Sequence, residues 1–403
     1  MKSLKDIVLY VIGDAFIKGV PLFLIYYLSQ NLASSELAVI AKYLALFNFF
    51  ILIGSLGQTS ICNVHFYKHD NPPEYLATSL QIALLSFLFI FVIACFGSLL
   101  NALAAFVASI GWLFTNVLLL FWNSKRNVIK NILFEGLQSL SILLVTILVF
   151  KLILPNEWAR ISIHSLIFIV FGFFSLAILA NKNDIKWRFN SGIAKTQIIS
   201  GIAIAFCSLS NWVVFFGDKY ILEGVYSTEV MGSFFLYQQF LYIYVVGALA
   251  LNKALRPFLY NSLEQCNVKN VIKSSVMYLV LLVAGALISF QLFEKVVIEY
   301  LISEEYQIFS TLMVIYILIG YFLFALTFWI HQILIYFDLK QSMYLMYSLS
   351  LLVFLGLTIS LLFFEIDVNN FPLIYLIGFG SSCCYGVHVS INAIKHKLNK
   401  VSS

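Results

Sequence analysis

Long apolar stretches recur along the whole chain, and they constrain the fold more than any other feature. Windowed hydropathy separates twelve of them, each close to the roughly 20 residues that a helix needs to cross a hydrocarbon core. The 403 residues are 62% hydrophobic and only 11% charged, whereas a soluble domain is about half apolar and about one quarter charged. The sequence therefore predicts an all-α, polytopic membrane protein.

The boundaries of these spans follow from the hydropathy profile and from turn residues. Between 76 and 122 the apolar run is almost unbroken, and only Gly97, Ser98 and Asn101 mark a turn. The expected spans are 7–28, 37–57, 76–96, 101–122, 132–154, 162–180, 197–217, 230–251, 274–293, 307–330, 341–363 and 371–392.

The charges between the spans test this count. With the N-terminus in the cytoplasm, 18 of the 24 Lys and Arg residues fall on the cytoplasmic side, and most acidic residues fall on the other side. This is the positive-inside pattern. It predicts an even number of spans, with both termini in the cytoplasm.

The basic loop at 181–196 divides the chain into two sets of six spans, which predicts lobes at 1–190 and 191–403. The second and eighth spans show a faint echo, since Glu36 and Gly54 have the same spacing as Glu229 and Gly247. Two halves inserted the same way round would be related by an axis along the membrane normal.

The first span carries Asp14, Lys18 and Pro21. Asp14 and Lys18 are four residues apart, so they share a helical face and can pair. Each would cost about 2.5–3.5 kcal/mol if it faced lipid near the bilayer centre. The pair therefore predicts either a structural contact between packed helices or the wall of a hydrated cavity, and Pro21 predicts a kink.

Polar residues in later spans leave similar alternatives open. Lys42 either reaches the outer headgroups or serves as a second cation on a cavity wall. Asp218 and Lys219 are expected at the outer rim of the seventh span, either as a solvated pair or as coupling or gating groups. Glu135 either reaches water or acts as a gate or proton site.

Amides and aromatic residues accompany these charges. Asn211 and Trp212 lie deeper in the seventh span, and the eighth span contains Tyr237, Gln238 and Gln239. Amides inside a membrane need hydrogen-bond partners. They predict either contacts between helices or one polar wall of a cavity.

Signals of other chemistry are absent from the sequence. It contains no phosphate-cradling glycine loop, no H-E-x-x-H and no G-x-S-x-G motif. The six cysteines form no metal-ligand pattern. We expect no catalytic residues, no metal site, no cofactor and no nucleic-acid partner.

With these residues laid out, the chain resembles bacterial lipid-linked oligosaccharide flippases of the O-antigen type. These belong to the polysaccharide-transport branch of the multidrug/oligosaccharidyl-lipid/polysaccharide (MOP) exporter superfamily. The resemblance rests on the length, the two six-span halves and the short loops, together with three segments. They are Lys18-Gly19-Val20-Pro21, ELAVIAKYLALFNFFILIGSLGQTS at 36–60, and GDKYILEGVYSTEVMGSFFLYQQF at 217–240.

The resemblance implies two six-helix lobes around a central cavity, as in MATE-like proteins. It implies a location in a bacterial cytoplasmic (inner) membrane, where an undecaprenyl-pyrophosphate-linked oligosaccharide is moved from the inner to the outer leaflet by alternating access. Asp14 is one candidate for proton or sodium coupling. Polysaccharide polymerase and chain-length regulator proteins are implied partners, besides membrane lipids. The expected cavity residues are Lys18, Asp14, Lys42, Asn48, Asn211, Trp212, Tyr237, Gln238 and Gln239.

Two other functions fit less well. A cation-coupled multidrug antiporter of the same superfamily would need an acidic or apolar cavity, which Lys18 and Lys42 disfavour. A membrane-embedded polysaccharide polymerase or ligase would need a sizeable outer loop bearing Arg or His residues, and the outer loops here are short.

Overall fold

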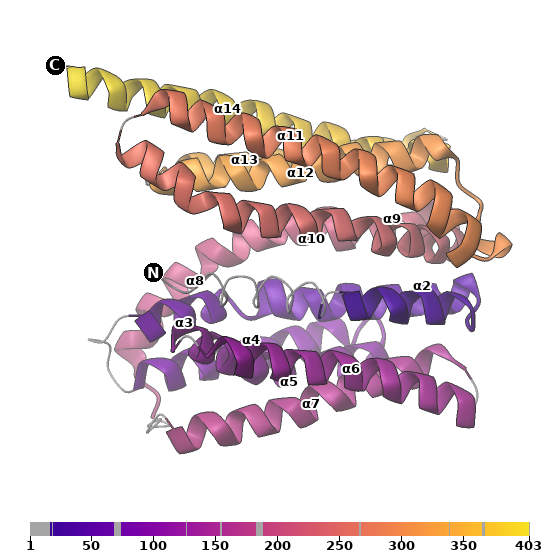
Figure 1. The fold of residues 1–403 in the computed structure, drawn as a ribbon. Coiled ribbons are helices and arrows are strands. Elements are labelled where there is room, and N and C mark those ends of the chain that lie inside the picture. Colours follow the sequence, from indigo (N-terminus) through magenta and orange to yellow (C-terminus); the bar gives the residue numbers. More distant parts are fainter. Residues whose placement is uncertain are drawn as a thin grey trace. The chain divides into compact units, whose positions relative to one another are not determined.

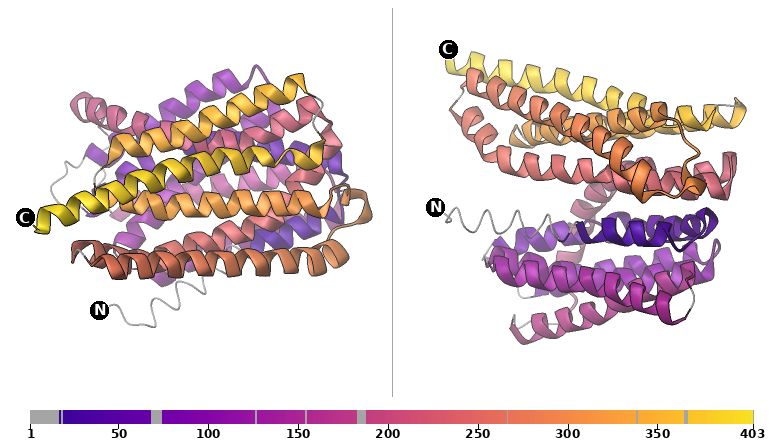
Figure 2. Two further views of the ribbon diagram at one scale, coloured as in Figure 1. Left: turned by 90° about the horizontal axis from the view of Figure 1, so that it is seen from above. Right: turned by 45° about the vertical axis from the view of Figure 1, so that its right-hand side comes forward.

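A computed structural model describes residues 17, 19–67, 74–125, 127–153, 155–182, 188–265, 267–337, 339–364 and 367–402. These residues form helices and connecting turns, and they contain no strand. The chain divides into two compact units, which we call the first unit (Met1–Tyr220) and the second unit (Ile221–Ser403). Within each unit the long helices run side by side along a common direction (Figure 1, Figure 2).

The first unit has helix Gly19–Ser29 as the first helix in its described part. Its second span is interrupted, because Leu56 and Gly57 adopt positive φ angles of 46° and 64° between η1 and α3. Its further elements are α2 (Ser34–Phe49), η1 (Phe50–Gly54), α3 (Gln58–Tyr67), α4 (Glu74–Ala94), α5 (Leu99–Ser124), α6 (Val128–Leu152), α7 (Glu157–Lys182), α8 (Ser191–Trp212) and η2 (Val213–Gly217).

The division between the units falls inside α9 (Asp218–Val225). Polar caps fix where several helices start: the Asn190 side chain accepts from the amides of Gly192 and Ile193, and the Ser227 hydroxyl accepts from Val230. The second unit contains α10 (Thr228–Glu264), α11 (Val268–Leu292), η3 (Phe293–Leu301), η4 (Glu304–Tyr306), α12 (Thr311–Tyr336), α13 (Lys340–Phe363), η5 (Val368–Asn370) and α14 (Leu373–Ser402).

Eleven helices in the described ranges are long and apolar enough to cross a membrane. They confirm the polytopic helical fold, and each coincides with one of the predicted spans from 37–57 onward. The turn at 95–98 separates α4 from α5 as predicted. Most of the first predicted span, with Asp14 and Lys18, lies outside the described residues.

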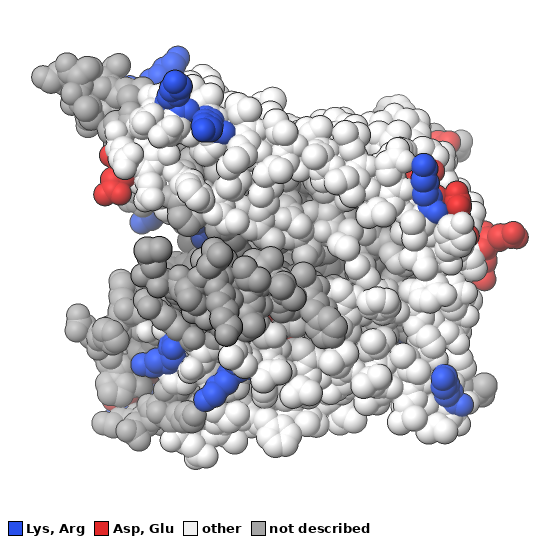
Figure 3. Space-filling view, viewed as in Figure 1, with Lys and Arg blue, Asp and Glu red and all other residues white. Residues whose placement is uncertain are grey.

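Several helices are longer than the predicted spans. The α10 helix has 37 residues and continues past the predicted end at 251, because hydropathy marks only the apolar part of a helix that goes on into polar sequence. Large apolar side chains such as Phe89, Phe173 and Leu287 remain exposed along the helices. In Figure 3 the charged side chains lie near helix ends, with an uncharged surface between them, as lipid contact requires.

The core of the first unit depends on a close crossing of α5 and α7. A Cβ atom added to Gly111 would overlap the Phe168 carbonyl oxygen, and one added to Gly172 would lie 2.5 Å from the Gly111 Cα atom. Small residues let membrane helices approach each other this closely. The two glycines therefore set the distance between the helices that hold the unit together.

The α8 helix packs against other helices of the first unit. The Gln197 amide donates to the Tyr75 carbonyl oxygen over 3.1 Å, joining α8 to α4. Further along, Gly201 lies against the Leu56 carbonyl oxygen at the interruption of the second span. The compact units thus divide after α8. The lobe boundary at 190/191 was predicted from the span count and concerns a repeat of six spans, and it stays a prediction.

The crossing of α5 and α7 gives a stability prediction. We expect Gly111→Val to destabilise the protein by about 3 kcal/mol, because added methyl groups would overlap backbone that cannot move aside. Thermal unfolding of purified protein in detergent would measure the loss. Gly356→Val on α13 is the matched control, since a Cβ there meets nothing within 4 Å. Equal melting temperatures for both variants would contradict the assigned crossing.

Candidate functional site

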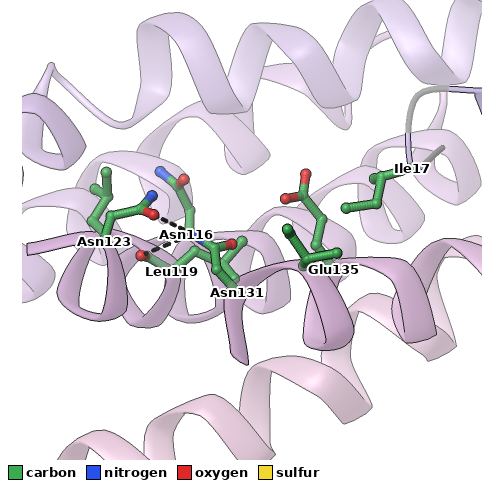
Figure 4. A pocket seen from close by; sticks show the side chains of 8 residues that line it. Ile17, Asn116, Leu119, Asn123, Asn131 and Glu135 are labelled. Atoms are coloured by element: carbon green, nitrogen blue, oxygen red, sulfur yellow. Dashed lines mark hydrogen bonds between the residues drawn. The ribbon is translucent and has the colours of Figure 1, made fainter. Parts of the chain in front are cut away.

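A polar pocket of about 130 Å³ lies between α5 and α6 of the first unit. Asn116, Asn123 and Asn131 lie together at one end of it, and Glu135 and Ile17 lie at the other (Figure 4). The charge pattern of the sequence predicts that this end of α5 and α6 lies on the cytoplasmic side. The lining residues are Ile17, Asn116, Leu119, Leu120, Asn123, Asn131, Ile132 and Glu135.

The asparagines of the pocket tie the two helices together. The Asn131 Nδ2 atom donates to Asn123 Oδ1 over 2.5 Å and lies 3.5 Å from the Leu119 carbonyl oxygen. Both contacts are made by the Nδ2 atom of Asn131, and neither involves its Oδ1 atom. A volume of 130 Å³ exceeds the share of one water molecule, about 30 Å³, several times. The pocket can therefore hold a hydrated ion among amide and carboxylate oxygens.

Glu135 is the charged residue of this pocket, and its side chain is half-buried. The sequence left open whether it reaches water or acts as a gate or proton site, and its position on a pocket wall is compatible with all three. Within the described ranges, no group of three or more His, Cys, Asp or Glu side chains could hold a metal ion. Among the described residues that line the pocket, Glu135 supplies one carboxylate beside neutral amide groups.

The solvated alternative for Asp218 and Lys219 is wrong, because both residues are buried. The two residues are 0% and 2% exposed, and they form an ion pair in which Lys219 Nζ lies 2.8 Å from Asp218 Oδ1. Lys219 also donates to the Phe215 carbonyl oxygen over 2.6 Å. The helical path does not end at this point, because the π-helical η2 carries it from α8 into α9. π-Helical segments are frequent at functional sites, and ionisable residues inside a membrane span are candidates for function.

Four residues of the expected cavity wall lie on α2 and α8, which pack against each other. The Trp212 Nε1 atom donates to the Ala45 carbonyl oxygen over 2.8 Å. The Trp212 and Phe49 rings form a T-shaped contact with their centroids 4.8 Å apart. Asn48 donates to the Leu44 carbonyl oxygen of its own helix. Asn211 and Lys42 lie half-buried on α8 and α2.

The three candidates of α10 lie in the second unit and differ in exposure. Tyr237 is buried against Phe293 and Phe309. Gln238 is buried and donates to the Tyr375 hydroxyl over 2.9 Å, which joins α10 to α14. Gln239 is half-buried. The structure thus gives Gln238 a contact between helices, and substrate contacts by this group stay a prediction.

Sequence reasoning missed the pocket asparagines, although a signal was present. Asn116 and Asn123 are seven residues apart, and Asn131 precedes Glu135 by four, so each pair shares a helical face. Amides repeated on one face of an apolar span indicate a polar contact with a neighbouring helix. Asp14 and Lys18, the first candidates, lie outside the described residues.

No family model matches the chain, and no curated protein matches it. Similar solved structures exist, all at low sequence identity. A multidrug resistance MATE family transporter of the MOP superfamily matches in its inward-facing conformation with a TM-score of 0.67 and 13% identity, covering 98% of this chain and 96% of that one. In an outward-facing conformation the TM-score is 0.62 at 14% identity, with 97% and 96% covered.

A third similar structure is a MOP superfamily transporter from Pyrococcus furiosus. It is described by a reverse polarity of its binding pocket that suggests a different function. It matches with a TM-score of 0.65 and 14% identity, covering 97% of this chain and 96% of that one. These neighbours confirm a MATE-like helical fold over nearly the whole chain. The oligosaccharide-flippase branch of the resemblance stays a prediction.

The Asp218–Lys219 pair gives a prediction that distinguishes a buried ion pair from a solvated one. We expect Asp218→Asn and Lys219→Gln each to destabilise the protein by about 3–5 kcal/mol, because each leaves one charge buried beside a neutral partner. The double variant should lose much less than the sum of the two. Thermal unfolding in detergent would measure the three losses, and additive effects of the single changes would show that the two charges are not coupled.

Proposed function

We propose that this protein is a transporter which moves an anionic, lipid-linked oligosaccharide from the inner to the outer leaflet of a bacterial cytoplasmic membrane. The substrate class is an undecaprenyl-pyrophosphate-linked repeat unit of O-antigen or a related surface polysaccharide. Both termini would lie in the cytoplasm, and polymerase and chain-length regulator proteins would act on the delivered unit. Several features of the chain support this proposal.

The observation that carries the proposal is the character of the wall formed by α2 and α8. Lys42 is the charged residue in the interior of α2, whereas Glu36 and Lys195 lie within the first two turns of α2 and α8. An amide and an indole ring, Asn48 and Trp212, lie on the same two packed helices. A fixed cation suits a pyrophosphate, and an aromatic face beside amides suits sugar rings and hydroxyls. A cationic drug would be repelled by the lysine.

The alternative is a cation-coupled multidrug antiporter, and one observation favours it. The neighbours in both conformations are multidrug resistance transporters. At 13–14% identity this likeness carries the fold and leaves the substrate open. The Pyrococcus furiosus neighbour, described by a pocket of reverse polarity and a suggested different function, illustrates that the fold accommodates more than one pocket polarity. We therefore base the choice between a flippase and an antiporter on Lys42 of α2.

Transport against a gradient needs a coupling ion, and the pocket at Glu135 is our candidate site in the described part of the first unit. Its amide oxygens and single carboxylate suit a proton or a hydrated sodium ion. Asp14 and the buried Asp218 are further coupling candidates, with Lys219 as the partner that would respond to a change at Asp218.

We expect Lys42→Gln to reduce surface glycan at least tenfold in a host that lacks its own flippase and carries the matching glycosyltransferases. The reason is that the substrate's pyrophosphate would lose a fixed positive charge. Glycan would be measured by gel electrophoresis and antibody staining, with membrane abundance measured by immunoblot.

Lys151→Gln is the matched control, because Lys151 is an exposed lysine near the end of α6. Normal glycan in both variants would contradict the assignment of Lys42 to the substrate. The wild-type protein would also be expressed in an efflux-deficient host to measure drug export. Drug export there, together with no restored glycan in the flippase-deficient host, would favour the antiporter.

A further inference from the structure

A second group of buried polar side chains lies in the first unit, apart from the pocket and from the α2–α8 wall residues named above. Arg160 and His164 occupy successive turns of one face of α7, and Tyr43 of α2 lies against them. Arg160 is 6% exposed and His164 is 7% exposed. No role in substrate binding or coupling has been assigned to these residues.

Hydrogen bonds connect this group into a chain. The Tyr43 hydroxyl lies 2.7 Å from His164 Nδ1 and 3.0 Å from the Ser165 hydroxyl oxygen. Ser165 donates to the carbonyl oxygen of Ala104 over 2.9 Å, or to that of Ile161 over 3.0 Å. The chain thus leads from the imidazole ring through two hydroxyl groups to a backbone acceptor.

This chain satisfies both protonation states of the imidazole. When His164 is neutral, the Tyr43 hydroxyl donates to Nδ1. When Nδ1 carries a proton, that N–H donates to the Tyr43 oxygen, Tyr43 donates to the Ser165 oxygen, and Ser165 donates to Ala104. Because only hydroxyl groups rotate between the two arrangements, the surrounding helices need not move.

Arg160 is the unusual member of the group. Its Nε and Nη1 atoms are buried without a hydrogen-bond partner, and in the described part of the chain it forms no ion pair. An uncompensated buried charge is costly. A proton on His164 would add a like charge one turn away, which the guanidinium would repel.

The remaining surroundings of His164 are nearly free of charge. Phe47 and Phe168 contact the ring at centroid distances of 5.1 Å and 4.6 Å. From α5 the contact is the Ala104 carbonyl oxygen, reached through Ser165. Within the described residues, no hydrogen bond or ring contact joins His164 to a titratable group of α5 or α6. Arg160 and Tyr43 are therefore the groups that control a charge on the ring.

We propose that His164 is a proton-binding site of the first unit and that Arg160 controls its occupancy. Arg160 lies three residues from Glu157, at the end of α7 that the charge pattern assigns to the outside. Its long side chain can swing toward outer water. A proton then leaves a hydronium ion of that water, breaking one O–H bond, and binds Nδ1, forming one N–H bond. When the guanidinium returns, the N–H bond breaks and the proton returns to water.

The site itself can be tested without knowing the substrate. Full-length protein labelled with ¹⁵N-histidine in lipid nanodiscs would be titrated by NMR, with the His164 signal assigned by its loss in His164→Asn. We expect Arg160→Gln to raise the titration midpoint by one pH unit or more, a tenfold gain in proton affinity. Arg160→Met provides the same test if the first variant is unstable.

Arg188→Gln is the matched control, because Arg188 is an exposed arginine of the same unit, and it should leave the midpoint unchanged. Tyr43→Phe removes the acceptor for the protonated ring and should lower the midpoint of the Arg160→Gln protein. An unchanged midpoint in both Arg160 variants, or an equal shift in Arg188→Gln, would overturn the proposal.

A role of this site in coupling rests on the proposed function. In the glycan assay, His164→Asn should then reduce surface glycan at least tenfold at normal membrane abundance, and normal glycan would overturn the coupling role. Failure of the wild-type protein to restore glycan would instead reject the proposed function, and the NMR titration would still decide whether His164 binds a proton.

Discussion

The bilayer core provides no water to hydrogen-bond a buried polar group, and the structure of both units depends on this constraint. Backbone groups are satisfied inside the helices, so the fold follows from span length. Polar side chains must find partners on neighbouring helices. Asn131 with Asn123, Gln197 with Tyr75, and Gln238 with Tyr375 do so. These bonds fix which helix faces meet.

The same constraint separates structural polar groups from candidates for function. A side chain whose hydrogen bonds are completed inside a unit, such as Gln238, needs no ligand. Arg160, with two buried nitrogen atoms lacking partners, retains a cost that only a second state or a bound group can offset. The pocket at Glu135 differs again, because it has room for a guest. Incomplete bonding and free volume are thus two independent signs of function.

Hydropathy predicted the spans because crossing a membrane imposes a length and a composition on each segment. It could not predict the burial of Asp218 and Lys219. The drop in hydropathy at Gly217 indicates the end of a span, whereas the π-helical η2 carries the helical path onward into α9 and turns both charges inward. A local change in helix type shifts which residues share a face, and apolar periodicity does not report it. For the same reason, the interruption at Leu56 went unpredicted.

The contacts of a single polar residue depend on pairs of helices far apart in sequence, which composition does not reveal. Tyr43 and His164 are 121 positions apart, yet the Gly111–Gly172 crossing brings α7 against α5 and the same helix packs on α2. Once that crossing is fixed, the spacing of Arg160 and His164 places both on the face that meets Tyr43. The glycines that allow the crossing thus also assemble the proton site, so changes that loosen α5 from α7 should disturb the His164 titration before they unfold the protein. A His164 midpoint that stays constant while the crossing loosens would show that Tyr43 and Arg160 hold the site independently of α5.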